Sequence, residues 1–310
     1  MFRKAVVGIV VVAAVLGGVA FFMPRPSPPV LSKLLTVYAA VAPITVNPVR
    51  EGIYYVSGGT ANSGFIVAVS SVILIDAQMF TPSAKKVLEA IAKITSKPVR
   101  TIILTHSDPD HVNALPAYPR GLDIIAQENV GPEMQEALDN PLKNTTSTPP
   151  ELKNYLPTKT VKNDETMVVD GVTLQLMHLG PAHTDSDLII YLPQQSVVFA
   201  GDILTPDFSA YPGIHLDKHG SSLGWIRTMQ ALIALDAQVY VSGHGEPLSR
   251  ADLQARLEVA VQRRTEIERL VAQHKTLEEV KAALNDPPPK GLAKMFPTFT
   301  DTTYQELTQH

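Results

Sequence analysis

Two series of strand-like sequence, each closed by a helical segment, organise this chain of 310 residues. In the first half, short β-branched runs separated by Gly and Ser cover residues 52–78, and apolar residues at helical spacing follow over 81–96. The second half repeats this order, with strand-like runs over 165–202 and a predicted helix over 222–235. A sheet with an apolar face needs a covering layer. The order therefore predicts an α/β fold of two halves with helices outside, a four-layered αβ/βα sandwich.

The first 23 residues predict export. Arg3 and Lys4 precede an unbroken apolar run over residues 5–23. A basic start before an apolar core is typical of a secretory signal, and this run also approaches the length that spans a bilayer. The small-x-small site at 40–42 lies far from the apolar core, which favours an uncleaved anchor over a cleaved signal. Both interpretations place the rest of the chain in the periplasm or another extracytoplasmic space.

These features divide the chain into three parts. We expect a signal peptide or N-terminal membrane anchor over 1–23, a Pro-rich tether over 24–48 and one domain over 49–310. The membrane would then be contacted only through the first part, and only if that part is not cleaved.

Composition narrows the chemistry and the partners. The chain has no cysteine, so the side chains that can bind a metal are His, Asp and Glu. A formal net charge of −4 and a pI near 6.1 give no electrostatic attraction to nucleic acid. We therefore expect a small-molecule substrate and no nucleic-acid partner. The sequence does not indicate an oligomeric state.

Four predicted strands are each followed by side chains that can bind a metal. Loops at strand ends are where a rigid scaffold displays functional groups. A single His or Asp there is usually a turn or surface residue, but repetition at four strand ends favours a metal centre. The side chains are His106, Asp108, Asp110, His111, His183, Asp202 and His244.

These residues resemble the motifs of the metallo-β-lactamase-fold hydrolases. That family has a His-x-His-x-Asp-His block, a distant His, an Asp after Gly and a His between two Gly. Here the corresponding residues are 106–111, His183, Asp202 and 243–245. The likeness extends from about residue 49 to residues 304–307 near the C-terminus. It implies the αβ/βα sandwich as the fold, but it does not identify a substrate.

The resemblance implies a centre with two metal ions, zinc in the first instance. His106, Asp108 and His183 would hold one ion, Asp110, His111 and His244 the other, and Asp202 would bridge them. Asp110 would also orient the attacking hydroxide, which makes it the expected catalytic residue. Asp76, at the end of a predicted strand, would hold the far nitrogen of a ligand His. A simple turn residue is the other interpretation of Asp76.

Asp108 stands where the family has its second His. Asp binds zinc through oxygen, so the site is not lost. Three carboxylates and a hydroxide would cancel the charge of two divalent ions, whereas the usual ligand set keeps one positive charge. A neutral site attracts anions less and acidifies bound water less. The harder oxygen ligand also makes Mn or Fe credible occupants. If Asp108 binds nothing, a mononuclear or degenerate site remains.

The function implied by the resemblance is that of an exported hydrolase. A metal-bound hydroxide would cleave a small ester, lactone, thioester or amide. The neutral ligand set predicts weak or absent β-lactam hydrolysis. Two alternatives stay open: a mononuclear iron enzyme similar to the sulfur dioxygenases, and a non-catalytic periplasmic binding protein on the same fold.

Overall fold

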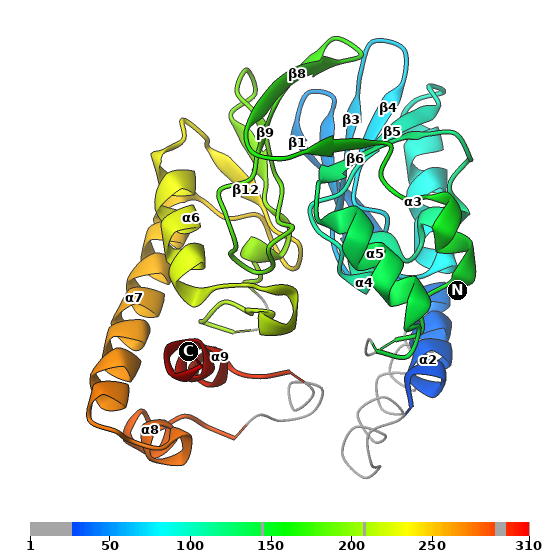
Figure 1. Cartoon of the computed structure of the whole chain (residues 1–310). Coiled ribbons are helices and arrows are strands. Elements are labelled where there is room, and N and C mark those ends of the chain that lie inside the picture. The colour runs from blue at the N-terminus through cyan, green and yellow to red at the C-terminus, as the bar shows by residue number, and fades with distance from the viewer. Residues whose placement is uncertain (1–26, 144–145, 207–208, 289–295, 310) are drawn as a thin grey trace, which may run out of the picture. The chain divides into compact units, whose positions relative to one another are not determined.

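The computed structural model describes residues 27–143, 146–206, 209–288 and 296–309, and they form two compact units (Figure 1). The first unit takes in the chain up to Lys162 together with Met167–Thr173, and the second takes in Asn163–Thr166 and the chain from Leu174 onward. The expected signal or anchor over 1–23 lies outside the described residues. Within the described residues, every helix is too short or too polar to cross a bilayer.

The first unit contains a seven-stranded sheet whose spatial order follows the chain, from β1 to β7. The first four strands pair antiparallel, and β4 to β7 pair parallel. Parallel neighbours end at the same edge of a sheet, so the segments after β4, β5 and β6 emerge together. The strands are β1 (Ile44–Arg50), β2 (Ile53–Gly58), β3 (Ser63–Val67), β4 (Val72–Ile75), β5 (Val99–Ile103), β6 (Asp123–Gln127) and β7 (Lys159–Val161).

Helices complete this unit: α3 and α5 pack against strands of the sheet, and α2 packs against α3. In α3, Pro82 lies in the first turn, where its missing amide hydrogen costs nothing. Ala84, Val87 and Ile91 recur at helical spacing and pack into the core. Burying one Val or Ile side chain contributes about 1.5–3 kcal/mol. The helices are α2 (Pro28–Val41), α3 (Thr81–Ile94), α4 (Pro109–Val112) and α5 (Val130–Asp139), with 3-10 helices η1 (Leu115–Ala117) and η2 (Pro150–Asn154).

A five-stranded sheet in the order β12-β11-β10-β9-β8 belongs mainly to the second unit, while the end of β8 and the start of β9 lie within Met167–Thr173 of the first unit. β9, β10 and β11 pair antiparallel, whereas β11 and β12 are parallel neighbours. Trp225, Met229 and Leu232 of α6 pack into the core of the second unit, together with Leu253 and Phe299.

The remaining elements all belong to this second half of the chain. The strands are β8 (Glu165–Val169), β9 (Val172–Met177), β10 (Ile189–Leu192), β11 (Val197–Phe199) and β12 (Val239–Val241). The helices are η3 (Gly201–Ile203), η4 (Leu216–Lys218), α6 (Ser222–Ala234), α7 (Arg250–Ala272), α8 (Leu277–Ala283) and α9 (Phe299–Thr308).

The mixed α/β fold with two sheets is confirmed, but the structure differs from the expected tether over 24–48. Helix α2 and the start of β1 occupy that stretch. Pro28 and Pro29 fall in the first helical turn, where proline is favoured, so the Pro-rich composition does not prevent a helix. Leu31 and Ala39 are buried, and the Lys86 ammonium of α3 donates to the carbonyl oxygen of Ala39 at 2.9 Å. Desolvation lowers the pKa of Lys86.

A single carboxylate fixes the turn between β8 and β9. Asp170, at φ 45°, accepts hydrogen bonds from the amide nitrogens of Ser70 and Ser71 at 2.8 and 2.7 Å. It also accepts from the two Ser hydroxyls at 2.9 and 2.7 Å. These bonds, that of the Ser71 hydroxyl foremost, lower the pKa of Asp170 to about 2.

We predict that Asp170→Asn lowers the thermal midpoint at pH 7 and has little effect at pH 2. The folded-state pKa lies below the unfolded value, so the carboxylate stabilises the fold above about pH 4 and loses this effect as the pH falls toward 2. Thermal unfolding followed by circular dichroism at several pH values measures the difference from wild type. The exposed Asp164→Asn is the control. A deficit of the same size at pH 2 and pH 7 would contradict the prediction.

Candidate metal centre

Four of the predicted ligands lie on the segment that follows β5. His106 and His111 are fully buried, and Asp108 is 5% exposed. Asp108 is extended, and Pro109 then starts the single turn of α4, which carries Asp110 and His111. The rings of His106 and His111 lie 4.2 Å apart between centroids. The strand end and the short helix thus bring two imidazoles and two carboxylates into one cluster.

The distances within this cluster suit metal ligation. The Nε2 atom of His106 lies 3.6 Å from Asp108 Oδ2, and that of His111 lies 3.9 Å from Asp110 Oδ2. Two ligand atoms at about 2.1 Å from one tetrahedral zinc are about 3.4 Å apart. Asp108, the residue that departs from the family motif, therefore stands at a ligand-like distance from His106.

Asp76 makes the contact with a candidate ligand His that its position suggests. Its Oδ2 lies 2.8 Å from His111 Nδ1, and its carboxylate also accepts from the amide and the hydroxyl of Thr105, both at 2.8 Å. Because a carboxylate only accepts, His111 carries its proton on Nδ1 and presents the lone pair of Nε2.

Thr105 orients a second imidazole. Its hydroxyl proton goes to Asp76, so the same oxygen accepts from His106 Nδ1 at 3.0 Å. The Nε2 lone pair of His106 therefore faces Asp108. Our sequence reasoning missed Thr105, although its place directly before His106 at a strand end is a usable signal. Nearby, burial first and then the charge of Asp76 raise the pKa of Tyr118, so that phenol stays protonated.

The other three predicted ligands lie in the second unit. Asp202 is in η3 after β11, and His244 follows β12, the parallel neighbour of β11. The Asp202 Oδ2 atom lies 3.2 Å from His244 Nε2, again a distance that suits two ligands of one ion. A Cβ atom at Gly243 would lie 1.9 Å from Asp202 Oδ1, so the close approach of residue 243 to the Asp202 carboxylate requires glycine.

His183 is held by a loop that sequence reasoning did not connect with it. Its Nδ1 lies 3.0 Å from the carbonyl oxygen of Gly213, which can only accept, so Nε2 is again the nitrogen left to bind a metal. The backbone amide of His215 donates to the His183 carbonyl at 2.9 Å, and the two rings lie 4.5 Å apart. Nothing in the local sequence around Gly213 signals this contact.

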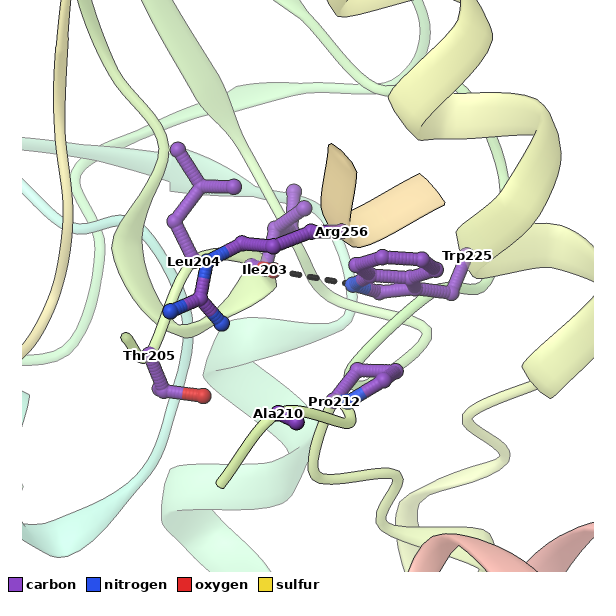
Figure 2. Close-up of a pocket in the computed structure, with 7 residues that line it drawn as sticks. All are labelled: Ile203, Leu204, Thr205, Ala210, Pro212, Trp225 and Arg256. Carbon is purple, nitrogen blue, oxygen red and sulfur yellow. Dashed lines mark hydrogen bonds between the residues drawn. The ribbon is translucent and has the colours of Figure 1, made fainter. Parts of the chain in front are cut away.

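A small pocket adjoins the Asp202 segment in the second unit (Figure 2). Trp225 forms one wall and donates from Nε1 to the carbonyl oxygen of Ile203 at 2.8 Å. The guanidinium of Arg256 donates to the carbonyl oxygen of Pro206 at 3.2 Å. The lining residues are Ile203, Leu204, Thr205, Ala210, Pro212, Trp225 and Arg256.

All seven predicted ligands are side chains that could hold a metal ion. Four belong to the first unit and three to the second. Their donors are imidazole nitrogens and carboxylate oxygens, which fit zinc and also accept manganese or iron. The donor chemistry and the spacing within each unit therefore fit a divalent metal.

Comparison with known proteins identifies the family. Residues 56–244 match the family model described as the metallo-beta-lactamase superfamily. The chain belongs to this superfamily. The expected resemblance is thus confirmed, and with it the relation to metal-dependent hydrolases, whose fold binds metal ions.

Three curated proteins show how varied the relatives of this member are. It is 23% identical to the linear primary-alkylsulfatase of Pseudomonas sp. (strain ATCC 19151), over 59% of this chain and 41% of that protein. It is 26% identical to the 2,4-dinitroanisole O-demethylase subunit alpha of Nocardioides sp. (strain JS1661), over 70% of this chain and 62% of that protein. The probable metallo-hydrolase YqjP of Bacillus subtilis (strain 168) is 22% identical, over 72% of this chain and 76% of that protein. The chain thus spans less than two thirds of the first two relatives.

Solved structures agree on the fold. A double mutant of the sec-alkyl sulfatase PisA1 superposes with a TM-score of 0.66 at 18% identity, over 94% of this chain and 55% of that chain. The DIM-1 metallo-beta-lactamase superposes with a TM-score of 0.56 at 18% identity, over 71% of this chain and 99% of that chain.

The curated relatives are named as a sulfatase, a demethylase subunit and a probable hydrolase. These names do not favour the dioxygenase or binding-protein alternatives.

We predict that Asp76→Asn weakens zinc binding by about 10–100-fold, because the support of His111 Nδ1 is lost. Competition with a chromogenic chelator measures the affinity, and circular dichroism checks that the variant is folded. Asp123→Asn, at an exposed position that starts β6, is the control. Equal affinities for wild type and Asp76→Asn would show that Asp76 does not support a ligand.

Proposed function

We propose that this member of the superfamily is a hydrolase with two metal ions, which cleaves a small ester, lactone, thioester or amide. The observation that carries the proposal is that each unit presents a buried set of His and Asp at its strand ends, with ligand-like spacing inside the set. We infer that the two sets act together. One ion would be held by His106, Asp108 and His183, and the other by Asp110, His111 and His244. Asp202 would contribute to both. Bound divalent ions would polarise the scissile bond and lower the pKa of the attacking water.

The residues of the chain have distinct tasks in this proposal. Thr105 and Asp76 fix which nitrogen each of His106 and His111 presents. Asp110 is less buried than its neighbours, with 18% of its side chain exposed, and its carboxylate lies beside His111 Nε2. We propose Asp110 as the catalytic residue that orients the attacking water and accepts its proton.

The charge of the ligand set and the relatives guide the choice of substrates. Three Asp among seven ligands leave little positive charge to attract an anionic substrate, which supports slow β-lactam turnover. Alkyl sulfates join the substrate panel because two similar proteins carry the name of alkyl sulfatases. Zinc is the proposed metal, and manganese or iron are the alternatives to be measured.

We predict two metal ions per chain in protein purified without added metal, as measured by mass spectrometry of the elements. Asp202→Ala and His183→Ala should each lose metal, and each should lose all activity against whichever esters, lactones, thioesters, amides or alkyl sulfates the wild type cleaves. His274→Ala, which removes an exposed histidine of the second unit, is the control. Full metal content and full rate in both ligand variants would overturn the assigned site, and a single iron per chain would favour the dioxygenase alternative.

We also propose that the protein is exported and stays attached to a membrane through residues 5–23. Helix α2 adds support, because Val30, Val37 and Val41 are 49%, 57% and 50% exposed and share one helix face. Lys33 is the one charged residue of this helix. A row of exposed valines on one helix face favours contact with an apolar surface.

The cover that we propose for this face is the bilayer surface. Residues 24–27 separate the apolar run from α2, a span of at most about 18 Å. The valine face would therefore lie near the lipid, and the long side chain of Lys33 could reach phosphate groups.

We predict that Val37→Cys, labelled with a polarity-sensitive dye, shifts to a shorter emission wavelength when the full chain is added to vesicles containing phosphatidylglycerol. The chain has no cysteine, so the label is specific. Val168→Cys is the matched control, because this valine is 68% exposed and belongs to β8 rather than to α2. A lipid-independent shift would mean that protein covers the face, and no shift would exclude contact with the bilayer.

A further inference from the structure

The C-terminal helix α9 reaches the start of α6 through one carboxylate. Glu306 Oε1 accepts a hydrogen bond from the Ser221 hydroxyl at 2.6 Å. Its Oε2 accepts from the amide nitrogen of Ser222 at 3.0 Å, and from the Ser222 hydroxyl. A helix N-terminus leaves amide hydrogens without helical partners, and a carboxylate there is favourable. Glu306 thus anchors residues 221–222 from a position 85 residues away in the chain.

Ser221 in turn holds the main chain next to a candidate ligand. Its amide donates to the carbonyl oxygen of Ala182 at 2.9 Å, directly before His183. At the other end of the same loop, the amide of His215 donates to the carbonyl oxygen of His183, and Gly220 donates to that of His215, both at 2.9 Å. Residues 215–221 therefore form the backbone support of His183.

Glycine makes this support close. A Cβ atom at Gly220 would lie 2.2 Å from the carbonyl oxygen of His183, and one at Gly224 would lie 1.8 Å from that of Pro181. The backbone on both sides of His183 is thus in direct contact with the backbone of the loop and of α6. A shift of residues 221–224 would be passed to His183, because closely packed backbone has no free space to absorb it.

A buried arginine completes the arrangement. Arg264 of α7 is 6% exposed, and its Nη1 donates to the Ser222 hydroxyl at 2.6 Å and lies 3.4 Å from Glu306 Oε2. Its Nε lies 3.2 Å from Glu268, whose side chain is 46% exposed. The charge of Glu306 is therefore paired, while Glu268 contacts the same arginine from its solvent side.

We propose that Glu306 is a positioning residue that sets the metal affinity of the centre through His183. The proposal rests on the proposed function, in which His183 is a ligand. Metal–ligand distances tolerate about 0.2 Å, so a small displacement of the His183 backbone weakens binding. Glu306 touches neither the metal nor a ligand side chain, and its effect passes through Ser221, Ser222 and the backbone at 182–183.

The test compares Glu306→Gln with Glu268→Gln in the full chain. Both variants remove a carboxylate charge next to Arg264, but only Glu306 bonds Ser221 and Ser222. Zinc affinity is measured by chelator competition on folded protein, and thermal unfolding is measured on the metal-free form. We expect Glu306→Gln to lose about tenfold or more in affinity for one of the two ions, and Glu268→Gln to stay within about twofold.

Ser221→Ala keeps the experiment informative if Glu306→Gln does not fold. It removes one bond to Glu306 and the bond that the Ser221 hydroxyl accepts from the Gly224 amide at the start of α6, but it retains the Ser221 amide that bonds Ala182. A loss of affinity is expected, because both lost bonds hold residues 221–224. If Glu306→Gln folds and binds zinc with wild-type affinity, the inference is overturned. Equal losses of affinity in Glu306→Gln and Glu268→Gln also overturn it. If Glu306→Gln does not fold, wild-type affinity in Ser221→Ala overturns it. If the wild-type protein binds no metal, the proposed function fails instead, so the two failures are distinguishable.

Discussion

The candidate ligands of the first unit depend on the hydrogen bonds that the buried carboxylate of Asp76 accepts. Its oxygens accept from the Thr105 amide and hydroxyl and from His111 Nδ1. The main chain beside it is also bound, because the Asp76 amide donates to Ile103 and the Ala77 amide donates to His111. The end of β4 therefore fixes both the position and the proton of the histidines that follow β5. An unpaired carboxylate at such a place would be costly, so the hydrogen bonds from Thr105 and His111 stabilise the buried Asp76.

The second unit reaches a similar result by another route. Its candidate ligand His183 is supported by a main-chain group, through the bond from its Nδ1 to the Gly213 carbonyl oxygen. The backbone at Gly220 and Gly243 approaches His183 and Asp202 so closely that any side chain there would collide with them, and both positions therefore require glycine. Backbone support is rigid but transmits displacement, so distant residues such as Glu306 acquire influence over the site. The two units thus place similar ligands with different physical means.

Superfamily membership and charge together frame the chemistry. The fold carries many reactions, so the family alone does not name a substrate. Asp108 sits 3.6 Å from His106 Nε2, and this spacing favours a carboxylate in the role of the missing histidine. In the proposed ligand set, three carboxylates instead of two would lower the positive charge that an anionic substrate meets. The range of reactions named among the relatives is consistent with a fold that carries many reactions.

The sequence by itself determined the features that depend on neighbours along the chain. Apolar β-branched runs predicted β4, β5 and β11, their polar ends marked the candidate ligands, and the helical spacing that starts at Thr81 predicted α3. It missed β1, whose strand includes Pro48, and α2, whose prolines suggested a tether. Only the tertiary structure assigned Thr105, Gly213 and Glu306, because their partners lie 29, 30 and 85 residues away. Local pattern follows from propensity and periodicity, whereas hydrogen bonds across such separations follow from packing, which no local pattern encodes.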